Sequence, residues 1–207
     1  MEMFISANHK RTDFPVHLKI EHKITIFEDR VQNWQINAAI AMGDRDIPHR
    51  GPAVLQILMS YFEMIGKYRA GYCGTDKSKQ YFLEGFVNVF PEAEQWPRDR
   101  FVSLTSGLYY RVRCGLYHTA VMGVDTGIVD LLKEPVFLAR DGTVLISPPM
   151  LGGRISHHFA KYIESLRDQE QADLRRSFEA RYDFDNGVTQ PNTAAPSDGF
   201  VTAVTLC

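Results

Sequence analysis

The chain has 207 residues, with 23 Lys and Arg residues against 25 Asp and Glu residues, and 44% of its residues are apolar. This length gives room for one large domain with a real core, and the composition excludes a disordered chain, a collagen-like repeat and a coiled-coil rod. The formal net charge of −2 excludes a globally basic nucleic-acid binder, so any polyanion site has to be local.

The sequence predicts neither a membrane-spanning helix nor a secretory signal. No apolar run approaches the roughly 18 residues that a membrane span needs. The first 14 residues mix basic and acidic side chains, so we expect a poorly ordered end within an N-terminal extension over residues 1–19. The three cysteines include no Cys-x-x-Cys pair and fit a reducing compartment, so we expect a cytoplasmic protein.

Helical periodicity dominates the first 122 residues. Apolar residues recur at three- and four-residue steps over residues 20–42, which predicts an amphipathic helix. A second helix is expected over residues 51–70, and a third follows a cap at Asp76 and runs to Val89. A fourth is expected over residues 98–122.

The pattern then changes to short β-prone runs. Residues 136–139 and 143–147 are such runs, joined through Asp141-Gly142, and this dipeptide is typical of tight hairpin turns. After Pro148-Pro149, apolar residues at helical spacing predict one long helix over about residues 153–182.

These elements predict a mainly α fold. We expect a helical bundle domain over residues 20–182, with a hairpin at about residues 136–147 inserted before the last helix. Residues 183–207 have the composition of a linker and form a C-terminal tail. Within this tail, residues 200–206 are β-prone but have no identifiable partner strand.

The helix expected over residues 98–122 has two apolar sides. The core-facing side carries Phe101, Leu104, Thr105, Leu108, Val112 and Leu116. The opposite side, flanked by Arg111, Arg113 and His118, carries Ser103, Tyr110, Cys114, Tyr117 and Val121. A helix with two such sides lies inside its bundle or is shared with a second subunit. Arg113 and His118 lie about 140° apart around the axis, so they converge only through a kink or a two-fold partner, which favours a homodimer.

The segment Tyr110-Arg111-Val112-Arg113-Cys114-Gly115-Leu116-Tyr117-His118 resembles the Arg-x4-His signature of the HEPN superfamily. The resemblance extends over the helical part of the chain, about residues 20–182. It implies an up-and-down helical bundle that dimerises along this helix, often with metal-independent endoribonuclease activity and no cofactor. Arg113 and His118 match the Arg and His of the motif. In active members a polar residue commonly follows the Arg, whereas here it is Cys114, and many relatives bind or scaffold without cleaving.

The resemblance assigns catalytic roles to Arg113 and His118, and the other residues of the candidate site are proposed from the sequence itself. His118 would transfer a proton as base or acid, and Arg113 would hold phosphate oxygens and stabilise the charge of the transition state. Arg111, Tyr117 and Tyr110 are candidates for phosphate or RNA contact. Glu63 and Cys114 are candidates for orienting Arg113, and an inhibitory partner protein is a further expectation.

Other sequence patterns are weaker indications of a functional site. Adjacent residues in a helix point about 100° apart, so His157 and His158 do not chelate, and we interpret both as structural or surface residues. No cluster has convincing metal-ligand spacing, so no metal is expected. Cys114 and His118 are four residues apart on one face, which leaves a thiolate nucleophile as a minor alternative.

Two further interpretations of the whole chain stay open. In the first, the protein is a non-catalytic dimerisation or interaction module of the same fold, and Arg113 and His118 only join the interface. In the second, it is a helical ligand-binding domain whose pocket is lined by Phe62, Tyr81, Phe86 and Tyr110.

Overall fold

The computed structural model describes residues 3–188, so the β-prone run at 200–206 lies outside the described residues. The described residues form six helices and one small three-stranded sheet, which confirms the predicted mainly α fold. The helical elements are α1 (Ile20–Asp29), α2 (Asn37–Asp44), α3 (Gly51–Ala70), α4 (Ser78–Val89), α5 (Arg98–Ser106), α6 (Gly115–Thr119), α7 (Pro148–Arg167) and α8 (Ala172–Asp185).

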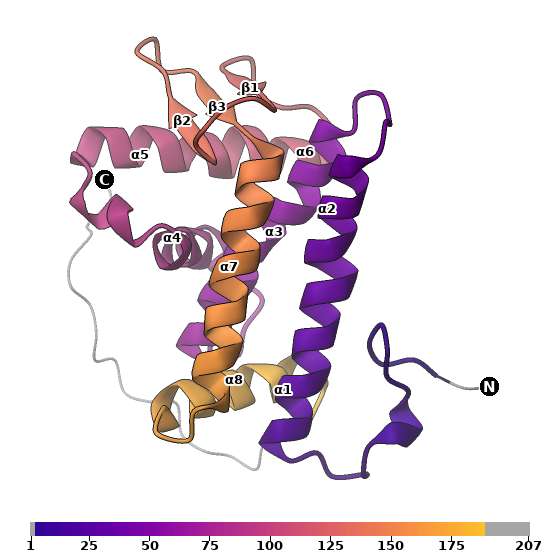
Figure 1. The fold of residues 1–207 in the computed structure, drawn as a ribbon. Coiled ribbons are helices and arrows are strands. Elements are labelled where there is room, and N and C mark those ends of the chain that lie inside the picture. The colour runs from indigo at the N-terminus through magenta and orange to yellow at the C-terminus, as the bar shows by residue number, and fades with distance from the viewer. Residues whose placement is uncertain (1–2, 189–207) are drawn as a thin grey trace.

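Two of the six helices contain a π-helical segment. Residues Arg30–Ile36 join α1 to α2, and Gly107–Cys114 join α5 to α6, so each pair forms one continuous helix. Figure 1 shows the α1–α2 helix and α7 side by side, with α5 and the sheet at one end and α8 crossing the other end. Within residues 3–188, no helix is both long and apolar enough to cross a membrane.

Helix α3 forms the centre of the core, because it is apolar on most of its circumference. Half of its 20 residues are buried, and it packs against α4, α7 and α8. It meets α4 through two glycines whose Cβ positions are filled by the other helix. A Cβ on Gly85 would lie 1.8 Å from the carbonyl oxygen of Phe62, and one on Gly66 would lie 2.1 Å from that of Tyr81. Only glycine permits two helix backbones to approach this closely.

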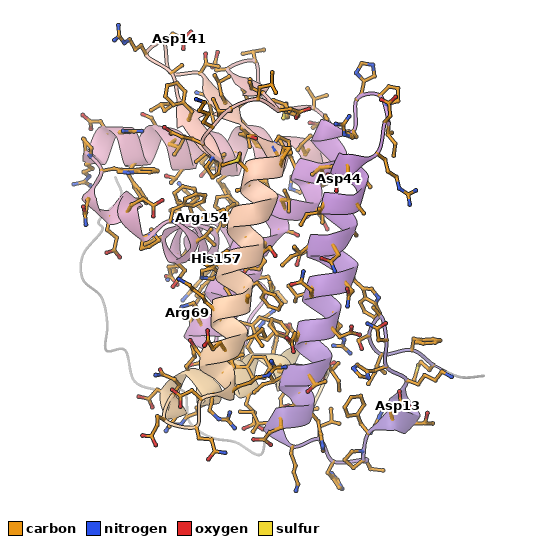
Figure 2. All side chains as sticks on the ribbon, in the orientation of Figure 1. Asp13, Asp44, Arg69, Asp141, Arg154 and His157 are labelled. Atoms are coloured by element: carbon orange, nitrogen blue, oxygen red, sulfur yellow. The ribbon has the colours of Figure 1, made fainter. Side chains whose placement is uncertain are left out.

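The hairpin is confirmed, and a third strand joins it. Strands β2 (Val136–Leu138) and β3 (Val144–Ile146) pair antiparallel, and Gly142 at their turn has a φ of 86°, which glycine adopts without steric cost. Asp141 lies at the outer tip of this turn (Figure 2). Strand β1 (Thr126–Ile128) pairs parallel with β3, giving the order β1-β3-β2. The sequence did not predict β1, because three residues carry no readable alternation.

The single long helix predicted over residues 153–182 is wrong, because the chain forms α7 and α8 instead. Helix α7 already begins at Pro148, where the hydroxyl of Ser147 caps it by accepting from the Met150 amide at 3.4 Å. It ends at Asp168, whose carboxylate accepts a hydrogen bond from the Glu170 amide at 3.0 Å. This local bond competes with helical hydrogen bonding and turns the chain.

The poorly ordered end predicted at the N-terminus is also wrong for residues 3–14, which pack against α1. Phe4 and Lys10 form an antiparallel bridge, and Arg11–Asp13 form a 3-10 helix. The amide and side chain of Asn8 donate to the Asp29 carboxylate at 2.7 and 2.6 Å. These partners are distant in sequence, so no local pattern indicates them.

The Asp29 anchor predicts a pH-dependent stability. Burial alone would raise the pKa of Asp29, but the polar groups of Ser6, Asn8 and Asn33 around its carboxylate lower it to about 2. Because the folded pKa lies below the usual 3.8, the stabilisation is complete above about pH 4 and is lost as the pH falls toward 2. We expect Asp29→Asn to lower the free energy of unfolding by about 2 kcal/mol at pH 6, and the difference from wild type to shrink toward pH 2.

Urea denaturation at several pH values measures this effect. Asp44→Asn is the matched control, since Asp44 is exposed at the end of α2 (Figure 2), and we expect it to change stability by less than about 0.5 kcal/mol. A difference between Asp29→Asn and wild type that stays constant from pH 6 to pH 2.5 would contradict the assignment.

Candidate functional site

Arg113 lies near the end of the π-helical segment, and its guanidinium is bound to α3. Its Nη2 atom is 2.8 Å from Oε2 of Glu63, and the two side chains are 20% and 15% exposed. The rings of Tyr109 and Tyr117 lie 5.7 and 5.3 Å from the guanidinium carbon, within the range of cation–π contact. The predicted pairing of Glu63 with Arg113 is therefore confirmed as a contact, and its orienting role remains a prediction.

Glu63 also binds two residues that the sequence analysis missed. Its Oε1 atom accepts from Nζ of Lys67 at 2.7 Å and from the hydroxyl of Ser78 at 2.8 Å. Burial would raise the pKa of Glu63, but these hydrogen bonds and the charges of Lys67 and Arg113 lower it, so the carboxylate is ionised at neutral pH. The four-residue spacing of Glu63 and Lys67 was a readable signal for their pairing, whereas nothing local indicates Ser78.

Glu63, Lys67 and Arg113 line a surface pocket of about 260 Å³ between α3, the end of α6 and α8. Tyr117 lies on its wall beside Arg113, and α8 contributes Arg181 and Asp185. Arg181 donates to both carboxylate oxygens of Asp185, at 3.1 and 2.6 Å, and to the carbonyl of Tyr72 at 2.7 Å. Arg181 therefore ties the end of α8 to the loop that follows α3.

His118 is exposed one residue before the end of α6. Its ring lies edge-on to the ring of Tyr117, with 5.6 Å between the centroids. The helix predicted to reach residue 122 ends at Thr119, because Ala120 adopts a left-handed conformation with a φ of 58°. Within the described chain, no hydrogen bond joins His118 to Arg113, as expected for residues that lie on different sides of one helix.

The other predicted site residues are not among those that line this pocket. Arg111 pairs with Asp125 at 3.2 Å on the surface, and Tyr110 is 53% exposed beneath the ammonium group of Lys79. Cys114 is half-buried, and its sulfur lies 3.9 Å from Nη1 of Arg113. The structure brings Arg113, Glu63 and Tyr117 together, and it places Arg111 and Tyr110 outside that group.

Of the two apolar sides predicted for this helix, one is buried in the single chain and the other is exposed. The core-facing side is buried, apart from the half-buried Phe101. On the opposite side, Tyr110, Tyr117 and Val121 are 53%, 64% and 64% exposed. This second apolar side is thus uncovered in one copy of the chain.

The aromatic ligand pocket considered from the sequence is wrong. Phe62 and Phe86 are fully buried and contact each other, with 5.6 Å between their ring centroids. Tyr81 is 6% exposed and stacks on Tyr72, while Tyr110 lies on the surface. Their apolar spacing was that of core residues, since three of the four side chains are buried in the core and the fourth is exposed.

Of the two histidines on α7, which were predicted to be structural or surface residues, His158 is structural and His157 is exposed. Tyr61 and Nδ1 of His158 share a hydrogen bond of 2.8 Å, and burial lowers the pKa of His158 to about 4. Arg154 and His157 project from the same helix (Figure 2), and Arg154 binds both carboxylate oxygens of Glu92. Across residues 3–188, no group of three or more His, Cys, Asp or Glu side chains is placed to hold a metal ion.

The arrangement supplies a fixed guanidinium beside a pocket and an exposed imidazole one helical turn further along. A guanidinium can bind phosphate oxygens through several donors, and an imidazole can gain or lose a proton near neutral pH. Comparison of the chain with protein-family models, with curated proteins and with solved structures finds no match.

Proposed function

We propose that this chain is a HEPN-like homodimer that binds RNA and cleaves it without a metal ion, using Arg113 and His118. The observation that carries the proposal is the setting of Arg113. Its guanidinium is held by Glu63 at the wall of a charged pocket, on the same helix as an exposed His118. A cation fixed in this way loses little conformational freedom when it binds a phosphate.

The proposed chemistry uses the RNA's own 2′-hydroxyl. The 2′-oxygen forms a bond to the adjacent phosphorus, and the bond from phosphorus to the 5′-oxygen of the next nucleotide breaks. One imidazole accepts the proton of the 2′-hydroxyl, and a second, protonated imidazole donates a proton to the departing oxygen. Arg113 stabilises the negative charge that develops on the phosphate oxygens in between.

A dimer supplies both imidazoles, one His118 from each protomer. The exposed side chains of Tyr110, Tyr117 and Val121 offer an apolar surface for a second copy. A two-fold axis along this surface would bring each Arg113 toward the His118 of the other protomer, which overcomes their separation on one helix.

The ion pair between Glu63 and Arg113 favours a second candidate function. A guanidinium whose charge is already balanced is also suited to a non-catalytic interaction module, in which the same helix binds another protein or RNA. The two candidates differ in what they predict for RNA cleavage.

Cleavage of a labelled single-stranded RNA in the presence of a chelator tests the proposal. We expect wild type to cleave, and His118→Ala and Arg113→Ala to be slower by about 100-fold or more. His157→Ala is the control, because it removes an exposed histidine from α7. Circular dichroism and light scattering establish that each variant is folded and dimeric.

The outcomes separate the candidates. Equal cleavage by wild type and both site variants would contradict the catalytic assignment. A folded, dimeric wild type without activity would contradict the nuclease and support the interaction module. A monomeric wild type would contradict the two-imidazole mechanism.

A further inference from the structure

A second surface pocket lies beside the sheet, at the end of the molecule opposite α8 (Figure 1). Its volume is about 300 Å³, at the lower limit of the range of about 300–1,000 Å³ that is typical of small-ligand sites. Its walls come from the end of α2, the loop into α3, the residues at and after the end of β1, and the start of α7. It shares no lining residue with the pocket beside Arg113, so its ligand is independent of the proposed RNA site.

The wall of this pocket combines an apolar surface with one pair of opposite charges. The apolar part is formed by Pro52, Val54, Ile128, Pro148 and Pro149. Arg50 and Asp130 contribute one positive and one negative charge, which cancel when the imidazole of His49 is neutral. Apolar pockets with a few placed polar groups bind small ligands and fix their orientation. A ligand that matches this wall is apolar at one end and carries both charges at the other.

Arg50 is held in place by one hydrogen bond and keeps its other donors for a ligand. Its Nε atom donates to the carbonyl of Gly43 at 2.7 Å, and its side chain is 32% exposed. A guanidinium has five N–H donors, and among the described residues the four on Nη1 and Nη2 make no hydrogen bond. The bond to Gly43 orients the guanidinium, so these four donors are presented from a fixed position.

Asp130 lies next to Arg50 without accepting a hydrogen bond from it. Nη2 of Arg50 is 3.8 Å from Oδ2 of Asp130, which is within the range of an ion pair but too long for a hydrogen bond. The Asp130 side chain is 55% exposed, and within residues 3–188 its carboxylate accepts no other hydrogen bond. A ligand carboxylate can therefore accept from Arg50 while a ligand ammonium group donates to Asp130, and both bonds are charge-assisted.

The short distance between Arg50 and Asp130 selects among ligands that carry both charges. A carboxylate and an ammonium group attached to one carbon atom are close enough to reach both partners at once. A ligand with a longer chain between its charges has to fold back on itself, which costs conformational freedom. We infer that this pocket binds a free α-amino acid, with its carboxylate on Arg50, its ammonium group on Asp130 and an apolar side chain on the apolar wall. This ligand function goes beyond the proposed nuclease and does not depend on it.

Calorimetric titration of the full chain with L-valine tests the inference. Three related compounds serve as separate arms. The first, 3-methylbutanoate, is valine without its ammonium group, and the second, 2-methylpropan-1-amine, is valine without its carboxylate. The third, 4-aminobutyrate, keeps both charges but separates them by three methylene groups. We expect L-valine to bind more tightly than each of the three by about tenfold or more, because only L-valine pairs with Arg50 and Asp130 together.

Two variants separate the roles of the charges. Asp130→Asn and Arg50→Gln are each expected to weaken valine binding by about tenfold or more. Asp130→Asn is also expected to strengthen the binding of 3-methylbutanoate, because it removes a carboxylate that repels this anion, whereas Arg50→Gln weakens it. A purely structural role for these residues would not reverse the effect between the two ligands. Asp44→Asn and Arg45→Gln, exposed residues at the end of α2 that do not line the pocket, are the controls and leave binding unchanged.

Three results would overturn the inference. They are no heat of binding at millimolar L-valine, equal binding of L-valine and 4-aminobutyrate, and valine binding that Asp130→Asn leaves at wild-type strength. Thermal melting of each variant accompanies the titrations, because Arg50 also bonds to the end of α2. If Arg50→Gln is unstable, the half-exposed Asp130 decides the result through its opposite effects on the two ligands. RNA cleavage is no part of this test, so the amino-acid site and the nuclease stand or fall separately.

Discussion

Replacing Gly85 with alanine is expected to lower the free energy of unfolding by about 3 kcal/mol. The new Cβ atom would lie 1.8 Å from the carbonyl oxygen and 2.7 Å from the carbonyl carbon of Phe62. Both are backbone atoms of α3, so no side chain can rotate away, and the two helices have to separate. This separation would loosen the largest contact between two helices in the fold.

Urea denaturation of Gly85→Ala and of the control Gly153→Ala measures the effect. Gly153 lies inside α7, and its Cβ position has no neighbour within 4 Å. Alanine there is expected to stabilise the protein by about 0.5–1 kcal/mol, because alanine favours the helix. Wild-type stability of Gly85→Ala would show that α3 and α4 do not cross at these glycines.

Replacing Lys23 with methionine is expected to lower the free energy of unfolding by about 3 kcal/mol or more. The ammonium group of Lys23 lies 2.7 Å from a carboxylate oxygen of both Glu179 and Asp183, and its side chain is 9% exposed. Asp183 is buried as well, so the substitution removes the Lys23 cation from beside a carboxylate in the interior. The pair also joins α1 to α8, which are adjacent only in the folded chain.

Comparison with two further variants distinguishes the effect of the buried charge from that of a surface ion pair. Arg176→Met removes the cation of an exposed pair with Asp173, and it is expected to change stability by less than about 1 kcal/mol. The double variant Lys23→Met/Asp183→Leu removes both buried charges and is expected to recover a large part of the loss. If Lys23→Met and Arg176→Met have equal effects in thermal and urea unfolding, the buried pair contributes no more than a surface pair.

The helices could be predicted because residues close to each helix end mark its boundary. Apolar spacing together with Gly71 and Pro52 gave α3 its limits, and the Asp-Gly dipeptide gave the hairpin its turn. The break after α7 and the strand β1 were missed, since the first depends on one Asx turn and the second on pairing with a strand far along the chain. Neither a single Asx turn nor the pairing of two short strands changes the periodicity of the apolar residues in the sequence.

The candidate site was partly predictable for the same reason. Glu63 was a candidate partner of Arg113 from the sequence, and the structure gives the contact between them. Arg181 lines the pocket from α8, and Ser78 binds Glu63 from α4, so only the fold reveals these two residues. The π-helical segment over Gly107–Cys114 also escaped prediction, because its residues fit an ordinary helical stripe.

The parallel pairing of β1 with β3 makes the His118 end of its helix a late-forming part of the molecule. The amide of Gly123 donates to the carbonyl of Arg111, and the chain then enters β1, which has its partner only once β3 exists. Contacts between distant segments form slowly, because a loop has to close before they contribute. We therefore expect the segment that follows His118 to reach its final position only once the residues of β3 are available for pairing.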